Sequence, residues 1–79
     1  MADSIDKRLD VCGVCCPLPI IRLGESIAAL KPGQTLEIMG NDPVFEASVR
    51  DFCQANGHTI LEVRRIDRRR IAMLIRVSA

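Results

Sequence analysis

The sequence contains no tryptophan or tyrosine, only two phenylalanines and a single histidine. A core must therefore be built mainly from Ile, Leu and Val, which a 48% apolar content allows within one small domain, 1–79. No uncharged run is long enough to cross a bilayer, and residues 1–8 lack an apolar signal-peptide core. We therefore expect a cytoplasmic protein without a membrane association, whose four cysteines are reduced thiols.

The net charge of +1 excludes a strongly basic or acidic chain, but one segment is locally basic. The arginines of this segment are Arg64, Arg65, Arg68, Arg69 and Arg70. They could be a solvated turn, or they could contact RNA phosphates or an acidic protein surface. No aromatic residue stands between them to stack on bases, so we do not expect direct nucleic-acid binding.

The apolar periodicity predicts six elements, in the order strand, helix, strand, helix, strand, strand. Their expected ranges are 9–11, 17–30, 35–39, 44–56, 59–66 and 71–77. Turn residues separate them: a proline–glycine turn at 31–33, Asp42 as an N-cap with Pro43 opening the second helix, and Gly57 as its C-cap. The fold class is therefore α/β (α+β): a βαβαββ two-layer sandwich with a four-stranded mixed sheet and two helices on one face.

Each element has one apolar face, which predicts the core. In the first helix this face is Ile20, Leu23, Ile27 and Leu30, and in the second it is Phe45, Val49, Phe52 and Cys53. In the strands the inward residues are Leu36 and Ile38, and then Ile71, Met73, Ile75 and Val77. Cys53 is accordingly expected to be a packing residue, because free cysteine behaves as a small apolar side chain.

Three of the four cysteines fall within residues 12–16, between the first strand and the first helix. Cys16 is the expected N-cap of that helix, and Pro17 suits its first position because proline lacks the N–H that would have no partner there. The positive end of the helix dipole favours a thiolate over a thiol. This pattern indicates sulfur chemistry at Cys16.

The spacing Asp10-x-x-Gly13-x-x-Cys16-Pro17-x-Pro19 resembles the signature of the TusA/SirA-like sulfur carriers. The similarity continues through the segments 31–34, 41–43 and 57–58. The resemblance implies that Cys16 carries a persulfide, supported by the other four residues of the signature, and that no cofactor is needed. It also implies a cysteine desulfurase or rhodanese as sulfur donor and a DsrE/TusD-like protein as acceptor. Transfer RNA thiolation, sulfur oxidation and cofactor sulfuration are the candidate pathways.

Cys12 and Cys15 depart from the family pattern and leave alternatives open. Their Cys-x-x-Cys spacing resembles a glutaredoxin-like dithiol, although no proline follows Pro43 to supply the cis-proline of that fold. Both cysteines are possible secondary thiols that could attack a persulfide on Cys16, Cys15 less readily because a disulfide between adjacent residues is strained. Alternatively, Cys12 is a small core residue that ends the first strand. We expect no metal site.

A zinc site would have to use the three clustered cysteines, with Cys53 or His58 as a further ligand. Adjacent cysteines do not readily bind one tetrahedral ion, and no second Cys-x-x-Cys exists. His58 is instead expected to be a surface or capping residue.

Overall fold

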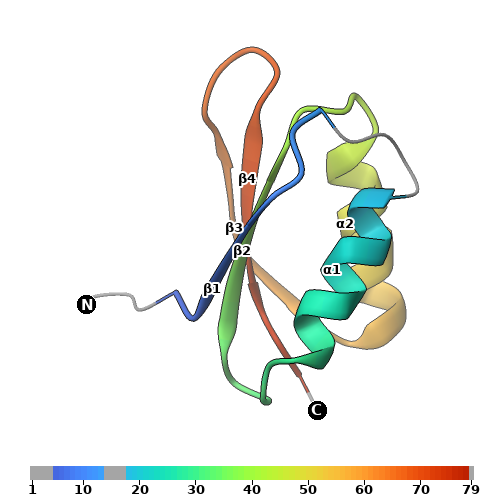
Figure 1. Ribbon diagram of the computed structural model, residues 1–79, viewed down its shortest axis with the longest axis vertical. Helices are drawn as coiled ribbons and strands as arrows, with labels where there is room; N and C mark the ends of the chain where they lie inside the picture. The colour runs from blue at the N-terminus through green and yellow to red at the C-terminus, as the bar shows by residue number, and fades with distance from the viewer. Residues whose placement is uncertain (1–4, 14–17, 79) are drawn as a thin grey trace.

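The computed structural model describes residues 5–13 and 18–78, and within them the chain forms two packed layers. The elements follow the predicted order (Figure 1). They are β1 (Lys7–Asp10), α1 (Leu18–Ala28), β2 (Thr35–Gly40), α2 (Phe45–Asn56), β3 (Thr59–Arg65) and β4 (Ile71–Arg76).

The four strands form one mixed sheet in the order β1-β2-β4-β3. β1 runs parallel to β2, whereas β4 is antiparallel to both β2 and β3. Both helices cover the same face of this sheet (Figure 1). The predicted α+β sandwich with two helices on one face is therefore confirmed.

The core lies between the helices and the sheet and is almost wholly aliphatic. Leu36 and Ile38 point inward from β2, with Thr35, Glu37 and Met39 on the other side, as the two-residue period of a strand requires. Among the described residues, the buried core residues are Val11, Leu23, Ile27, Leu36, Ile38, Phe45, Val49, Cys53, Met73, Ile75 and Val77. The apolar faces predicted for α1, α2, β2 and β4 are therefore confirmed, with Ile20, Leu30, Phe52 and Ile71 partly buried against the core.

The start of α2 differs from the prediction. The helix begins at Phe45 with Val44 as its N-cap, so the expected N-cap at Asp42 is wrong. The Asp42 carboxylate still accepts a hydrogen bond from the N–H of Val44 at 2.9 Å, and its carbonyl accepts one from the N–H of Phe45 at 2.9 Å. Asp42 therefore closes a turn before the helix, because its side chain can bind a backbone N–H two residues on.

The pairing of β3 with β4 contains an irregularity that the sequence did not predict. The register shifts between Ile60 and Glu62, so Leu61 has no direct partner on β4 and is 44% exposed. A bulge of this kind breaks the strict alternation of side chains along β3. It leaves an apolar side chain on the outside of the sheet.

The open face of the sheet carries a row of charges. Glu37 on β2 lies between Arg8 on β1, at 3.4 Å, and Arg64 on β3, at 3.1 Å. These exposed pairs add little stability, because water screens them. Arg64 is thereby separated from the other arginines of the basic segment.

The far end of α2 and the chain terminus are joined by His58. Gly57 ends the helix in the left-handed conformation with φ of 78°, as predicted for the C-cap. His58 then stacks on Phe52, with 6.0 Å between ring centroids, and its Nδ1 accepts the N–H of Ser78 at 3.1 Å. The histidine is therefore engaged in structure just after the C-terminal end of α2.

Candidate functional site

One end of the molecule brings together the segments that the sequence singled out. β1 and β2 both end there, α1 and α2 both begin there, and the turn between β3 and β4 projects beyond it (Figure 1). Parallel strands followed by helices produce this arrangement, because each crossover starts at the carboxyl end of its strand. The segment from Asp10 to Leu18 therefore starts and finishes at this end.

Hydrogen bonds fix the chain as it leaves β1. The Asp10 carboxylate accepts the N–H of Cys12 at 2.9 Å, and the Asn41 side-chain oxygen accepts the N–H of Gly13 at 2.8 Å. Gly13 has φ of 81°, a conformation that residues with a Cβ rarely adopt. Asp10 and Gly13, predicted as supporting residues, thus both shape the turn that leads to the cysteines. Cys15, Cys16 and Pro17 lie outside the described residues.

Cys12 is half-buried and does not enter the core. The adjacent Val11, which is only 1% exposed, is the core residue at the end of β1, so the interpretation of Cys12 as a core residue is wrong. Burial first, and then the hydrogen bond to the Asp10 carboxylate, raise the pKa of the Cys12 thiol. Cys12 is therefore held as a thiol, the poorly nucleophilic form.

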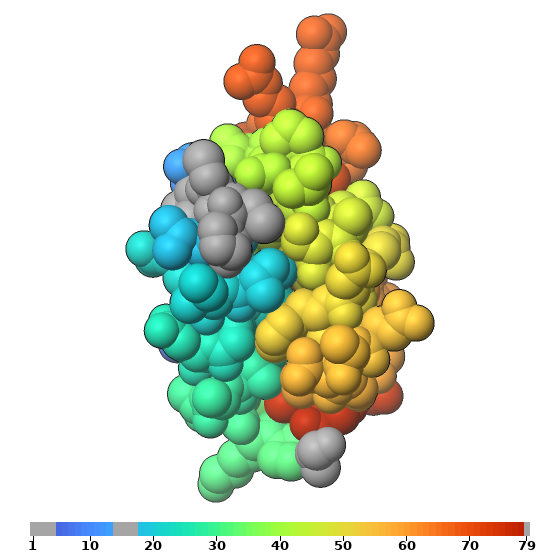
Figure 2. Space-filling model, turned by 90° about the vertical axis from the view of Figure 1, so that its right-hand side faces the viewer, coloured from blue at the N-terminus to red at the C-terminus, as the bar shows by residue number. Residues whose placement is uncertain are grey.

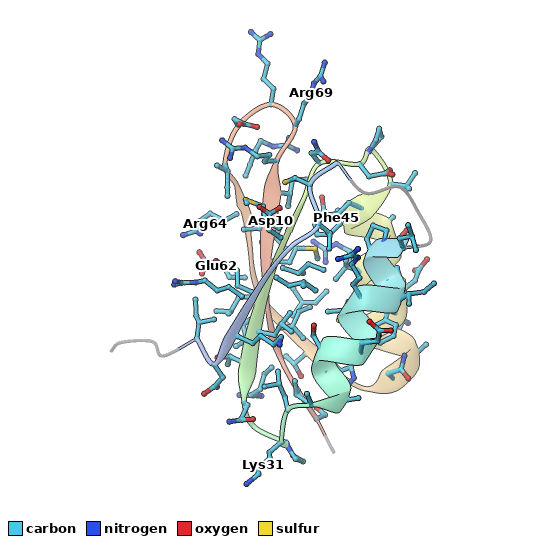
Figure 3. The ribbon with its side chains drawn as sticks, viewed as in Figure 1. Asp10, Lys31, Phe45, Glu62, Arg64 and Arg69 are labelled. Carbon is cyan, nitrogen blue, oxygen red and sulfur yellow. The ribbon has the colours of Figure 1, made fainter. Side chains whose placement is uncertain are left out.

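The Asp10 carboxylate is the electrostatic counterpart of this thiol. Hydrogen bonds from the backbone N–H and then the thiol of Cys12 hold the pKa of Asp10 below its usual value, and the charge of Arg70 acts in the same direction. Arg70 itself pairs with Asp67 at 2.8 Å. Asp10 aligns with Met39 of β2 and so lies on the face of the sheet that the helices do not cover, at the last residue of β1. Figure 3 labels Asp10 among the strands, below the hairpin turn. Arg70 of the hairpin turn is thus close enough to interact with both Asp67 and Asp10.

Asp67 organises the hairpin turn. Its Oδ1 accepts the N–H groups of Arg69 at 3.0 Å and Arg70 at 2.8 Å, and these bonds lower the pKa of Asp67 to about 2. The N–H of Ile66 closes the turn onto the carbonyl of Arg70 at 2.9 Å. The predicted hairpin around 67–70 is confirmed, and its side chains stand clear above the helix-covered face (Figure 2).

The starts of the two helices combine one buried anchor with exposed apolar side chains. Pro19, a predicted supporting residue, is buried in the first turn of α1. Leu18 and Ile21 are each 49% exposed on the same helix, and Val44, the N-cap of α2, is 50% exposed. These three side chains place exposed apolar surface at the end of the molecule where both helices begin.

The other candidate ligands do not meet at this end. Cys53 is 1% exposed in the core, and burial raises the pKa of its thiol to about 11, which confirms it as a packing residue. In residues 5–13 and 18–78, no three side chains of His, Cys, Asp or Glu are grouped to hold a metal ion. None of the helices in that part of the chain is long and apolar enough to span a membrane.

Two contributions to this end were missed by sequence reasoning. Asn41 belongs to the segment 41–43 that resembles the family, but its bond to Gly13, across 28 residues of sequence, was not predicted. Arg70 was grouped with the other arginines, although its ion pair with Asp67 and its position near Asp10 set it apart. The bond of Asn41 could have been anticipated from its place directly after a strand, because asparagine side chains there often bind backbone N–H groups.

Comparison with known proteins identifies a family. The model of the family "Sulfurtransferase TusA" matches residues 7–77. A sulfur carrier protein TusA from Allochromatium vinosum is 38% identical over 65 residues, covering 78% of this chain and 80% of that protein. A longer Aquifex aeolicus protein is 32% identical over 73 residues, covering 92% of this chain but only 37% of that protein.

A solved structure shows the same fold. The SirA-like protein from Desulfitobacterium hafniense superposes with a TM-score of 0.81, covering 92% of this chain and 99% of that one. Sequence identity is 20%, so this likeness concerns the fold alone.

Proposed function

Because the chain belongs to the TusA sulfurtransferase family, we propose that it is a sulfur carrier that holds sulfur as a persulfide on Cys16. The observation that carries the proposal is the family match over residues 7–77, a range that includes Cys16. The relative from Allochromatium vinosum bears the name of a sulfur carrier. The proposed carrier unit is one domain, 1–79.

The chemistry needs one reactive thiolate and a well-defined approach to it. The Cys16 thiolate attacks the outer sulfur of a donor persulfide, the donor cysteine leaves as a thiolate, and Cys16 holds the new persulfide. An acceptor thiolate then attacks that outer sulfur, which returns Cys16 to its thiolate. Electrons balance in both steps, so no oxidant, metal or cofactor takes part.

Local structure supports Cys16 as the thiol used. Cys16 precedes Leu18, the first residue of α1, by two positions, and the positive end of a helix dipole favours a thiolate. Pro17 and Pro19 restrict the backbone on either side of Leu18. By contrast, Cys12 is held as a thiol beside Asp10 and Cys53 is buried, so neither matches the requirement for an exposed thiolate.

The single histidine, His58, follows the C-terminal end of α2, so it is not placed to act as a base where the helices begin. We therefore propose that partner proteins supply the remaining catalytic groups. A cysteine desulfurase or a rhodanese is the proposed donor, and a DsrE/TusD-like protein the proposed acceptor, in the cytoplasm. Transfer RNA thiolation, sulfur oxidation and cofactor sulfuration are the pathways that such a relay could serve.

Sulfur loading of cysteine variants tests the proposal. Wild-type protein is incubated with a cysteine desulfurase and free cysteine under anaerobic conditions, and its intact mass is measured. Wild type and Cys53→Ser should each gain one sulfur atom, whereas Cys16→Ser should gain none. Circular dichroism checks that Cys16→Ser is folded. Loading of folded Cys16→Ser to the level of the wild type would refute the assignment.

A further inference from the structure

The hairpin turn carries three arginines that form no ion pair with any described residue. Arg65, Arg68 and Arg69 are exposed, and within the described part of the chain their guanidinium groups take part in none of the ion pairs. Figure 3 shows Arg69 at the tip of the hairpin, directed away from the body of the molecule. Arg64 and Arg70, in contrast, are paired with Glu37 and Asp67.

The carboxylates around these arginines are already engaged. Glu46 on α2 pairs with Arg50 at 2.8 Å. Asp42 accepts the N–H of Val44, and Asp67 is held by the turn that it organises. Among the described residues, these three arginines outnumber Asp10 and Asp42, the carboxylates at this end that form no ion pair, so a positive excess remains at one end of a chain whose net charge is +1.

A groove runs between the three arginines and the end of the molecule where α2 begins. Arg65, Arg68 and Arg69 line one side of it, and the start of α2 lines the other. Asn41, which accepts the N–H of Gly13, is also part of its wall. A partner seated against the arginines would thus lie next to the turn that leads to the cysteines, with the half-exposed Val44 beside it.

Resting on the proposed carrier function, we propose that Arg65, Arg68 and Arg69 form a docking surface for a carboxylate-rich segment next to the reactive cysteine of a partner protein. Arginine suits this role, because its planar group binds carboxylates through paired hydrogen bonds. Complementary charge also raises the rate at which partners meet in the productive orientation.

A protein fits this surface better than a nucleic acid does. The half-exposed side chains at the helix starts, Leu18, Ile21 and Val44, offer apolar contacts. No aromatic side chain in the described residues lies at this end except Phe45, which is 2% exposed and cannot stack on bases.

The test measures how the charge of a peptide affects its reaction with the protein. Three peptides of equal length each carry one cysteine as a thionitrobenzoate disulfide, flanked by glutamate, glutamine or lysine. A protein thiolate attacks the peptide sulfur, a mixed disulfide forms, and coloured thionitrobenzoate leaves. At low salt, we expect the glutamate peptide to react about tenfold faster than the lysine peptide, with the ratio falling towards one at high salt.

Two variants with equal net charge identify the surface. The test variant is Arg65→Gln/Arg68→Gln/Arg69→Gln. The control is Lys7→Gln/Lys31→Gln/Arg76→Gln, which removes three exposed charges near the opposite end, where Figure 3 shows Lys31. The preference for the glutamate peptide should be largely lost in the test variant and kept in the control. Equal preference in both variants would overturn the proposal.

Two further outcomes are separated by the same experiment. Failure of Cys16→Ser to lower the exchange rate would refute the proposed function, while the charge ratio would still report on the arginines. A fluorescent oligouridylate is titrated in parallel. If it binds the wild type but not the test variant, while the peptide ratio stays near one, the surface binds nucleic acid and the proposal is wrong.

Discussion

Gly40, the last residue of β2, is packed so closely that the effect of adding one methyl group can be worked out from the structure. A Cβ at this position would lie 2.4 Å from Cδ1 and 2.6 Å from Cε1 of Phe45. Favourable contacts between carbon atoms lie at about 3.5–4.0 Å, so the ring would have to move by about 1 Å. Phe45 is 2% exposed in the core, and it can move only by disturbing its neighbours.

We expect Gly40→Ala to lower the free energy of unfolding by about 1–3 kcal/mol, the usual cost of overpacking a core. Gly40 does not have a positive φ, so the collision with Phe45 and not backbone strain causes the loss. With a slope of about 1 kcal/mol/M for a small domain, the midpoint of urea unfolding should fall by about 1–3 M.

Gly24→Ala is the matched control. Its added Cβ would lie 3.8 Å from two ring carbons of Phe52, an ordinary contact, within the interior of α1. The same chemical change should therefore raise the free energy of unfolding by about 0.5–1 kcal/mol, because alanine favours a helix over glycine. The two substitutions should shift the urea midpoint in opposite directions.

A double-mutant cycle tests the stated cause. Phe45→Leu should restore part of the stability in the Gly40→Ala background while destabilising the wild type, with a coupling of about 1 kcal/mol. An unchanged urea midpoint for Gly40→Ala, or an equal cost of Phe45→Leu in both backgrounds, would show that a collision with Phe45 does not limit the residue at position 40.

Three further changes probe the functional end. Asn41→Ala should speed amide exchange at Gly13 and lower the free energy of unfolding by about 0.5–1.5 kcal/mol, the range for a lost hydrogen bond; unchanged exchange would contradict the bond's role. Asp10→Asn should lower the pKa of Cys12, so that iodoacetamide labels the Cys12 peptide faster near neutral pH; equal labelling would show that the carboxylate does not restrain the thiol. The pKa of Asp67 is depressed to about 2, so its stabilisation of the hairpin should be present above its unfolded value of about 3.9 and be lost as pH falls towards 2, with no such transition in Asp67→Asn by NMR.

Periodicity was sufficient to predict the fold, because each element buries one face. Leu23 and Ile27 recur at helical spacing, and Leu36 and Ile38 alternate as in a strand. Both apolar faces are buried when the helix packs against the sheet. The β3 bulge at Leu61 escaped prediction, since a shifted register depends on the partner strand. Asp42 was misassigned, because an N-cap and a turn use the same bond from a backbone N–H to a carboxylate.

The candidate site was predictable only where the residues are adjacent in sequence. The bond between Asp10 and Cys12 spans two residues and follows from a local turn, whereas the bond between Asn41 and Gly13 depends on the crossover that brings β2 beside β1. The division of the basic segment into paired and free arginines likewise requires the positions of the acidic partners in space. Cys16 as the persulfide residue remains a prediction, supported by the family match and by its place in the sequence.

The most direct test of the central claim is to locate the transferred sulfur within the chain. Wild-type protein loaded by a desulfurase is alkylated, digested with trypsin and sequenced by tandem mass spectrometry. Cleavage after Arg8 and Arg22 gives one peptide with three cysteines, and cleavage after Arg50 and Arg64 isolates Cys53. We predict the added sulfur on Cys16. Its presence on another cysteine, with Cys16 carrying only the alkyl group, would contradict it.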